Sequence, residues 1–582
     1  MTSPSDDISS RVEGAEIFAF PRAQAARAAS GLADQPRSGS DRSSQSSGAD
    51  REDAGGGGHS GAGGEDGDLD RRLARYPLTD LGNAERFATR NEKSLRYCPE
   101  IGWLWWDGKH WSPHGADEIV KLREHDCVRA IQREADAIRR TTDDYVVKET
   151  KSEMIWWSDK IAGWGRLSES AQKLASISKR AAAMLAIDVD RLDADPMKIN
   201  LLNGTLHIRK CDDGDYVALA PHDSDNYITK LAPVAYEPEA LCPLFRQFLD
   251  EIQPPKIISA SSSEAVGDQK LDRSMQSFLL QWFGYSLTGD VGEQKMVFFY
   301  GRGRNGKGVL VNLMSYIAGD YAASVGIETF LDSGRARAGG QATPDLAKLP
   351  GVRLLTTSEP KKGASLDEGL VKLVTGGDPI DARHLNKNFF QFKPDLKLTM
   401  QGNYRPKVAG TDEGIWNRIV LVPFSVFIPP ERRDPHLGEK LKAEASGVLN
   451  LLLDGLRLWL DEGLKLPGEV KRATEEYRSD SDPLGRFLGA CTEQRMQHRI
   501  KASEMHALFC AWAKANGETE WSAKGLGQAL KERGIAAKKS DTIWWLDIAL
   551  TRCVSDFVDA DGKPWRQRNE EDWVGGGDDD ER

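Results

Sequence analysis

A glycine-rich segment near the middle of the chain has the residue types that bind phosphate. An apolar run, KMVFFY, gives way to GRGRNGKG, which places Gly301, Gly303 and Gly306 just before Lys307. In such a loop, successive backbone N–H groups cup phosphate oxygens while the lysine ammonium reaches the β- and γ-phosphates. The positive end of a following helix adds to the attraction. We therefore expect a phosphate-binding P-loop and a nucleotide-driven enzyme.

Two regular elements must hold this loop. Apolar residues 297–300 predict a buried strand before it, and the apolar spacing over 309–317 predicts a helix after it. The expected nucleotide ligands are Gly301, Arg302, Gly303, Arg304, Asn305, Gly306, Lys307, Gly308 and Val309. Gly308 stands where a Ser or Thr normally holds Mg²⁺, so the metal must be held through water or by another residue.

The same glycines also fit two other interpretations. They spell G-x-G-x-x-G, a dinucleotide fingerprint, and Asp320 lies near the spacing of a ribose-binding acid. However, Asp320 follows Ala318-Gly319 at the expected end of the helix rather than a second strand, and Lys307 has no role with a dinucleotide. A glycine turn without any ligand is the remaining alternative.

Hydrolysis of a nucleotide also needs polar groups at the ends of neighbouring strands. GVRLLTTSEP predicts a strand with Glu359 at its end, to order Mg²⁺ and polarise water. DLKLTMQGN predicts another strand that finishes on Asn403, a candidate sensor of the γ-phosphate. WNRIVLVPF predicts a strand flanked by Arg418. This arginine either stabilises transition-state charge on a nucleotide bound by a neighbouring subunit or is an ordinary strand-flanking arginine. The catalytic candidates are thus Lys307, Glu359, Asn403 and Arg418, and Glu359 is the metal candidate.

Between the strands that end at Glu359 and Asn403, the sequence predicts a basic-tipped hairpin. Strands containing Ile380 and FFQF flank a turn near Asn386-Lys387. Arg383, His384 and Lys387 are the DNA-binding candidates, and a solvated hairpin end is the alternative.

Composition restricts the class of protein. A chain of 582 residues with 39% apolar content supports several domains with real cores. Seven cysteines without a C-x-x-C pair argue against disulfides or structural zinc. The net charge is −11, yet residues 291–440 carry 21 Lys and Arg against 16 Asp and Glu, which keeps nucleic-acid binding possible there. No signal-peptide pattern or long apolar run occurs, so we expect a cytoplasmic protein without a membrane partner.

Composition and periodicity also divide the chain. We expect a disordered low-complexity tail at 1–72, an N-terminal α+β region at 73–275, an ATPase core at 276–430, a helical extension at 431–481, a small DNA-binding domain at 482–556 and an acidic tail at 557–582. Hairpins are predicted about Asp107-Gly108 and Asn203-Gly204. The tryptophans of GWLWWDGKHW are interpreted as a packed hairpin face rather than a base-stacking surface.

Taken in order, GRGRNGKG, TTSEP, LVKLVTGGDPIDARHL, QGNYRP and GIWNRIVLVPF resemble the superfamily 3 helicase module of phage and plasmid primase-helicases, related to the poxvirus primase-helicase. LTDLGNAERFA, LLNGTLHI and ITKLAPVAY resemble the region that precedes this module in the family. The resemblance covers the chain from about residue 76 to about 550.

The resemblance implies an α/β fold with an AAA+-like ATPase core that assembles as a hexameric ring, uses ATP and Mg²⁺, and moves 3′ to 5′ on single-stranded DNA to unwind a replication fork. By this resemblance, residues 301–308 are Walker A, Glu359 is Walker B, Asn403 is the sensor and Arg418 is the arginine finger. Arg383, His384 and Lys387 would grip DNA. Gly308 and Asn417 depart from the usual family pattern.

The C-terminal stretch reads as helix, helix and hairpin over ASEMHALFCAWAKANG, SAKGLGQALKERG and KKSDTIWWLDIAL, and resembles the winged-helix module that often follows such helicases. The candidate phosphate-facing side chains there, with a solvated face as the alternative, are Lys524, Lys531, Arg533, Lys538 and Lys539. The acids of AIDVDRLDADP are interpreted as capping or solvated groups rather than a primase centre, so primer synthesis is expected from a separate primase.

The leading hypothesis is an ATP-dependent replicative DNA helicase of a phage, prophage or plasmid. The alternative is an origin-binding initiator or loader whose ATPase is weak because Gly308 replaces the hydroxyl residue.

Overall fold

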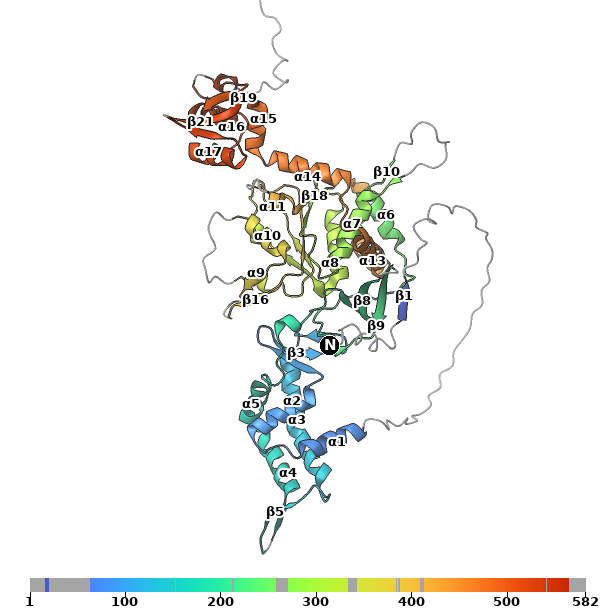
Figure 1. The fold of residues 1–582 in the computed structure, drawn as a ribbon. Coiled ribbons are helices and arrows are strands. Elements are labelled where there is room, and N and C mark those ends of the chain that lie inside the picture. The colour runs from blue at the N-terminus through green and yellow to red at the C-terminus, as the bar shows by residue number, and fades with distance from the viewer. Residues whose placement is uncertain are drawn as a thin grey trace, which may run out of the picture.

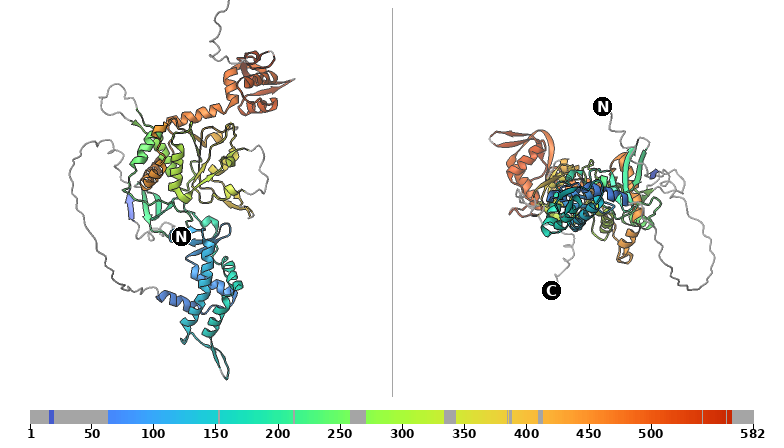
Figure 2. Two further views of the ribbon diagram at one scale, coloured as in Figure 1. Left: turned by 180° about the vertical axis from the view of Figure 1, so that it is seen from behind. Right: turned by 90° about the horizontal axis from the view of Figure 1, so that it is seen from below.

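The computed structural model describes residues 16–19, 63–151, 153–211, 214–257, 271–332, 343–383, 385, 388–408, 413–540, 542–559 and 561–564. Figures 1 and 2 show a helical N-terminal region at one end, a central α/β region, and a small C-terminal region at the other end. The domain boundaries given above stay predictions. In the described residues, no helix combines the length and the apolarity that crossing a membrane requires.

The N-terminal region packs helices around a small antiparallel sheet. Its helices are α1 (Gly63–Leu73), α2 (Asp80–Asn91), α3 (Ala116–Ile138), α4 (Trp157–Ser168) and α5 (Ala171–Ala181). Its strands are β2 (Leu95–Cys98), β3 (Gly102–Trp106) and β4 (Trp111–Ser112), with a separate hairpin of β5 (Val146–Glu149) and β6 (Met154–Trp156). The predicted hairpin about Asp107-Gly108 is confirmed, because β3 pairs with β4 across it. Trp111 is only 1% exposed, as expected of a packed face.

A second antiparallel sheet links this region to the centre of the molecule. Its strand order is β1-β9-β8-β7, formed by β1 (Glu16–Ala19), β7 (Lys198–Leu201), β8 (Gly204–Cys211) and β9 (Gly214–Ala220). The predicted hairpin about Asn203-Gly204 is confirmed by the pairing of β7 with β8. Within the stretch predicted to be a disordered low-complexity tail, residues 1–72, the structure describes β1, which pairs with β9, and the start of α1 at Gly63.

The central sheet is parallel and has the strand order β13-β14-β17-β12-β18. Its strands are β12 (Met296–Tyr300), β13 (Ala322–Val325), β14 (Leu354–Thr357), β17 (Lys397–Gly402) and β18 (Ile419–Pro423). Val297 and Phe299 enter one hydrophobic cluster, whereas Met296 and Phe298 enter the cluster on the opposite face. This division explains the continuous apolar run of β12, because a parallel sheet is covered on both faces.

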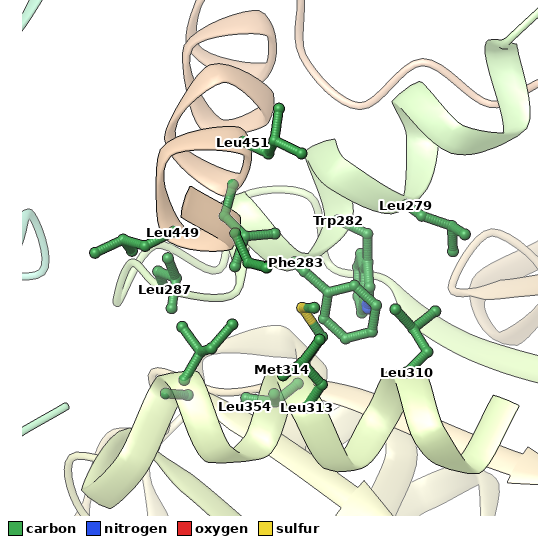
Figure 3. Close-up of a cluster of buried hydrophobic side chains, with 14 of the residues drawn as sticks. Leu279, Trp282, Phe283, Leu287, Leu310, Leu313, Met314, Leu354, Leu449 and Leu451 are labelled. Carbon is green, nitrogen blue, oxygen red and sulfur yellow. The ribbon is translucent and has the colours of Figure 1, made fainter. Parts of the chain in front are cut away.

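Helices from distant parts of the sequence cover the first face. They are α6 (Pro243–Ile252), α7 (Ser274–Tyr285), α8 (Lys307–Ala318), α12 (Leu437–Ala443) and α13 (Ala445–Glu462). Figure 3 shows side chains of α7, α8 and α13 meeting in one core. Helices α7 and α13 approach closely through Gly284 and Gly455, where an added Cβ would lie 2.3 Å from a carbonyl oxygen of the other helix.

The opposite face is covered by shorter elements and one long helix. These are α9 (Pro344–Ala347), α10 (Glu368–Gly376), α11 (Glu413–Trp416) and α14 (Gly468–Asp480), with a hairpin of β15 (Ile380–Ala382) and β16 (Phe390–Phe392). A further short pair, β10 (Lys256–Ile257) and β11 (Leu271–Asp272), lies before α7. Helix α14 is fixed to β18 by a hydrogen bond of 3.0 Å from the Leu421 amide to Thr474 Oγ1.

Helix α14 continues into the C-terminal region through a two-residue connector, Ser481-Asp482. This region contains α15 (Pro483–Cys491), β19 (Thr492–Lys501), α16 (Ala502–Ala515), α17 (Ala523–Glu532), β20 (Ala537–Lys539) and β21 (Ile543–Leu550). The predicted helix, helix and hairpin are confirmed as α16, α17 and β20–β21. Strand β19 was not predicted, and it completes a sheet of order β19-β21-β20.

Candidate functional site

The glycine-rich loop joins β12 to α8 as the sequence predicts. Strand β12 ends at Tyr300, and helix α8 begins at Lys307. Gly303, Arg304 and Gly306 have φ angles of 85°, 55° and 81°. Left-handed residues so close together turn successive backbone N–H groups toward one side, which creates a concave surface suited to an anion.

Two glycines of the loop have no room for a side chain. An added Cβ at Gly301 would lie 2.2 Å from the carbonyl oxygen of Phe424, and at Gly306 it would lie 2.3 Å from Cγ2 of Ile252. The loop therefore lies between the end of β18 and the end of α6. Asn305 reinforces the first contact, since its Nδ2 donates to the Phe424 carbonyl oxygen at 3.0 Å.

Lys307 is directed into the loop rather than into solvent. Its side chain is 6% exposed, and Nζ donates to the Gly301 carbonyl oxygen at 2.7 Å and to Asn403 Oδ1 at 3.5 Å. Burial lowers the pKa of the Lys307 ammonium, and the negative charge of Glu359 opposes this shift. A cation is thus held where the concave backbone opens.

Asn403 and Glu359 follow neighbouring strands of the same sheet. Asn403 comes directly after β17, and Glu359 comes two residues after β14. The backbone N–H of Asn403 donates to Glu359 Oε1 at 2.7 Å. Because the carboxyl ends of parallel strands meet at one edge, Lys307, Asn403 and Glu359 gather in one place although they are far apart in sequence. Glu359 remains exposed, so its carboxylate is accessible to water.

Gly308 lies at the first turn of α8 and is open on its outer side. A Cβ added there meets no atom within 4 Å. The position thus has space for a hydroxyl side chain, but it supplies no ligand as it stands. Among the described residues, no cluster of three or more His, Cys, Asp or Glu side chains forms a metal site.

Arg418 lies at the opposite end of the sheet from the glycine loop. It precedes β18, and its carbonyl oxygen accepts from the Met296 amide at the start of β12. The five residues of β18 separate it from the loop edge by about 16 Å. Its guanidinium donates to Thr375 Oγ1 at 3.1 Å and to the Gly414 carbonyl oxygen at 2.9 Å. The structure therefore does not bring Arg418 to Lys307 of the same chain.

The strand pairing of the predicted hairpin is confirmed, since β15 pairs antiparallel to β16. The Arg383 guanidinium lies 4.7 Å from the centre of the Phe389 ring. His384 and Lys387 lie outside the described residues. Leu385 at the turn is 72% exposed.

Asp320 does not occupy the position that a dinucleotide site requires. It lies in a short helical turn, Gly319–Tyr321, after α8 and before β13, instead of following a second strand. Its Oδ2 accepts from the Leu231 amide at 3.1 Å. Asp320 thus ties the central region to the preceding segment.

Sequence reasoning missed Arg405, two residues after Asn403. Its guanidinium lies 5.2 Å from the ring centre of Tyr300 and 5.3 Å from that of Tyr477 on α14. It also forms a 2.9 Å ion pair with Asp480. An arginine within QGNYRP was the available signal, but its aromatic partners become apparent only when α14 is placed beside the sheet.

Comparison with known proteins gives a family match before the glycine loop and several viral relatives. Residues 84–254 match the family described as D5 N terminal like. A candidate helicase, L207/L206 of Acanthamoeba polyphaga mimivirus, is 30% identical over 264 residues, which is 42% of this chain and 27% of the relative. A candidate helicase, 022R of Frog virus 3, is 27% identical over 47% of this chain and 30% of the relative. A candidate primase, C962R of African swine fever virus, is 22% identical over 56% of this chain and 34% of the relative.

The chain spans about a third or less of the length of these relatives. The structure of the NrS-1 C terminal region matches with a TM-score of 0.33 and 13% identity over 54% of this chain and 78% of that chain. The fold described above rests on this chain's own strand order and not on that likeness. The D5 N terminal-like region and the viral relatives together confirm the resemblance of this chain to the primase-helicase family.

Proposed function

We propose that this protein is an ATP-driven DNA helicase that acts as a ring on single-stranded DNA. The observation that carries the proposal is the placement of the buried Lys307 ammonium between the glycine loop and the strand-end residues Asn403 and Glu359. The resemblance to viral helicases agrees with this chemistry.

The chain's residues fit a nucleoside triphosphate with magnesium. The loop has a concave backbone whose glycines allow it to pack closely against Phe424 and Ile252, and a cation lies at its opening. Lys307 would neutralise charge on the β- and γ-phosphates, and Asn403 would orient the γ-phosphate or the attacking water. Glu359 would accept a hydrogen bond from that water and hold the metal through water, since Gly308 offers no oxygen. Magnesium, when bound, supplies charge neutralisation on the phosphates.

The position of Arg418 favours assembly into a ring. It lies about 16 Å from the loop edge of its own sheet, so an arginine finger at this position would act on a nucleotide held by another subunit, and its guanidinium would leave Thr375 and Gly414 to do so. An arginine supplied in this way contributes about 10³ to 10⁵ in rate. The same proposal includes assembly as a hexamer and a separate primase as partner. It also includes DNA contacts by the hairpin of Arg383 and by a winged-helix-like C-terminal region.

Lys307→Ala tests the proposal directly. We expect DNA-stimulated ATP hydrolysis to fall by about 10²- to 10³-fold, as when one charge-stabilising donor is removed. Lys348→Ala is the matched control, because Lys348 is an exposed lysine that pairs with Asp345 away from the loop. Equal hydrolysis by Lys307→Ala and wild type would refute the assignment.

A second candidate function is an origin-binding initiator or loader with a weak ATPase. Gly308 is the observation that favours it, since the usual hydroxyl ligand is missing. Nucleotide binding with negligible turnover on forked DNA would select this candidate over the helicase.

A further inference from the structure

The C-terminal sheet has one covered face and one open face. Ile500 of β19 and Trp545 of β21 are opposite each other and are buried against Leu508, Phe509 and Leu530 of α16 and α17. Successive residues of a strand point to opposite faces, so Lys501 and Trp544 lie on the open face. We call Arg499, Lys501, Lys538 and Trp544 the open-face group.

The open-face group is arranged around the indole of Trp544. Lys501 and Lys538 are its direct cross-strand neighbours, one on each side. The Arg499 guanidinium lies 4.6 Å from the ring centre, and the Lys501 ammonium lies 5.8 Å from it. The three cations are exposed, whereas Trp544 is half-buried between them.

The positive charge of this group is not neutralised within the protein. In the part of the chain that the structure describes, no carboxylate forms an ion pair with Arg499, Lys501 or Lys538. Asp547, the nearest acid along β21, instead accepts from the Gln497 amide at 2.9 Å. Like charges held on neighbouring strands repel one another, so this face is complementary to a polyanion.

We propose that the open-face group binds single-stranded DNA, with phosphates on Lys501 and Lys538 and an unpaired base stacked against Trp544 and Arg499. A cation-lined aromatic surface is the arrangement that binds single strands without sequence preference. Duplex DNA is a poorer fit, because its paired bases are stacked on one another and offer no free ring face to a flat sheet. The inference is independent of ATP hydrolysis, since the group lies outside the central sheet.

The proposed phosphate contacts are tested by measuring how the affinity of the full chain for a labelled oligothymidine depends on salt concentration. The measurement is made in the absence of ATP. Each phosphate contact contributes a slope of about 0.7 for single strands, so Lys501→Ala/Lys538→Ala should lower the slope of log affinity against log salt by about 1.4. The matched control is Lys471→Ala/Lys514→Ala, which removes two exposed lysines, one from α14 and one from α16, away from the open-face group. An equal change in both double variants would overturn the proposal, because the open face would then have no special role.

The stacking part is tested by Trp544→Leu and Trp544→Phe. We expect Trp544→Leu to weaken binding of the single strand roughly tenfold, while Trp544→Phe retains most of the affinity. Thermal melting of both variants shows whether a loss reflects unfolding of the C-terminal region, and bromodeoxyuridine cross-linking to the wild type locates the contact in the peptide that contains Trp544. Equal losses for single strand and duplex, or cross-links confined to other peptides, would refute the proposal. We expect Trp544→Leu to hydrolyse ATP like the wild type. A loss of DNA binding by this variant is therefore distinguishable from the loss of hydrolysis that tests Lys307.

Discussion

The two sheets of this protein differ in how much of their surface is covered. The central parallel sheet is buried on both faces, so Val297 and Phe298 are in contact with different hydrophobic cores. The C-terminal sheet is covered on one face only, and its other face carries the open-face group. The candidate catalytic residues of the central sheet therefore lie at one edge, where Lys307, Asn403 and Glu359 meet. In the C-terminal sheet, polar side chains lie along the strands themselves.

The largest expected effect is on the rate of ATP hydrolysis, and it comes from the end of the central sheet opposite the glycine loop. Arg418→Ala should lower ATP hydrolysis by the assembled protein by about 10³- to 10⁵-fold and should leave ATP binding intact, because the guanidinium is too far from its own loop. Turnover by mixtures of wild-type and variant subunits provides the measurement. Activity strictly proportional to the wild-type fraction would contradict action between subunits.

Glu359→Gln probes the other end of the sheet. We expect hydrolysis to fall by about 10²- to 10⁴-fold, because the amide cannot accept the proton of the attacking water. ATP affinity, measured by isothermal titration, should change little, since Lys307 and the loop backbone remain. The control is Glu475→Gln, an exposed glutamate on α14. Wild-type turnover by Glu359→Gln would remove this carboxylate from the mechanism.

Substitutions on the sheet faces should affect stability unequally. Phe298→Ala deletes a ring that is 1% exposed and should lower the free energy of unfolding by about 3 to 5 kcal/mol. Lys538→Ala, on the open face, should change it by less than about 0.5 kcal/mol. Urea unfolding followed by circular dichroism measures both. Similar losses for the two variants would mean that the C-terminal face is covered in solution.

The smallest effect is expected from restoring a hydroxyl group. Gly308→Thr meets no steric obstacle, because a Cβ at this position contacts nothing within 4 Å. It should strengthen the magnesium dependence of hydrolysis and raise turnover by roughly up to tenfold, the worth of one hydrogen bond to a charged group. Gly308→Ala separates this effect from improved helix propensity. A decrease specific to Gly308→Thr would show that the glycine itself is required.

Sequence reasoning predicted the local elements well. The strand before the glycine loop and the helix after it follow from apolar spacing, and the turns at Asp107-Gly108 and Asn203-Gly204 follow from local turn chemistry. It also selected Glu359 and Asn403 because a polar residue ends each of two apolar runs.

The features that sequence reasoning did not predict depend on contacts between distant segments of the chain. Apolar spacing does not say that β17 lies between β14 and β12, which brings Asn403 next to both Lys307 and Glu359. Strand β19 has mostly exposed residues and no alternation, so nothing marks it locally as a strand. The aromatic partners of Arg405 are Tyr300 of β12 and Tyr477 of α14, which are far apart in the sequence.

The connector between α14 and α15 constrains the two proposed DNA contacts. Asp482 caps α15 by accepting from the Gly485 amide at 2.9 Å and also pairs with Arg533, while Thr474 holds α14 along β18. Because the connector is held on both sides, the C-terminal region lies at a restricted distance from the central region and is not on a flexible linker. A DNA single strand can contact the β15–β16 hairpin and the open-face group together only if it is long enough to span the distance between them. The affinity for oligonucleotides should therefore rise sharply once their length exceeds this span.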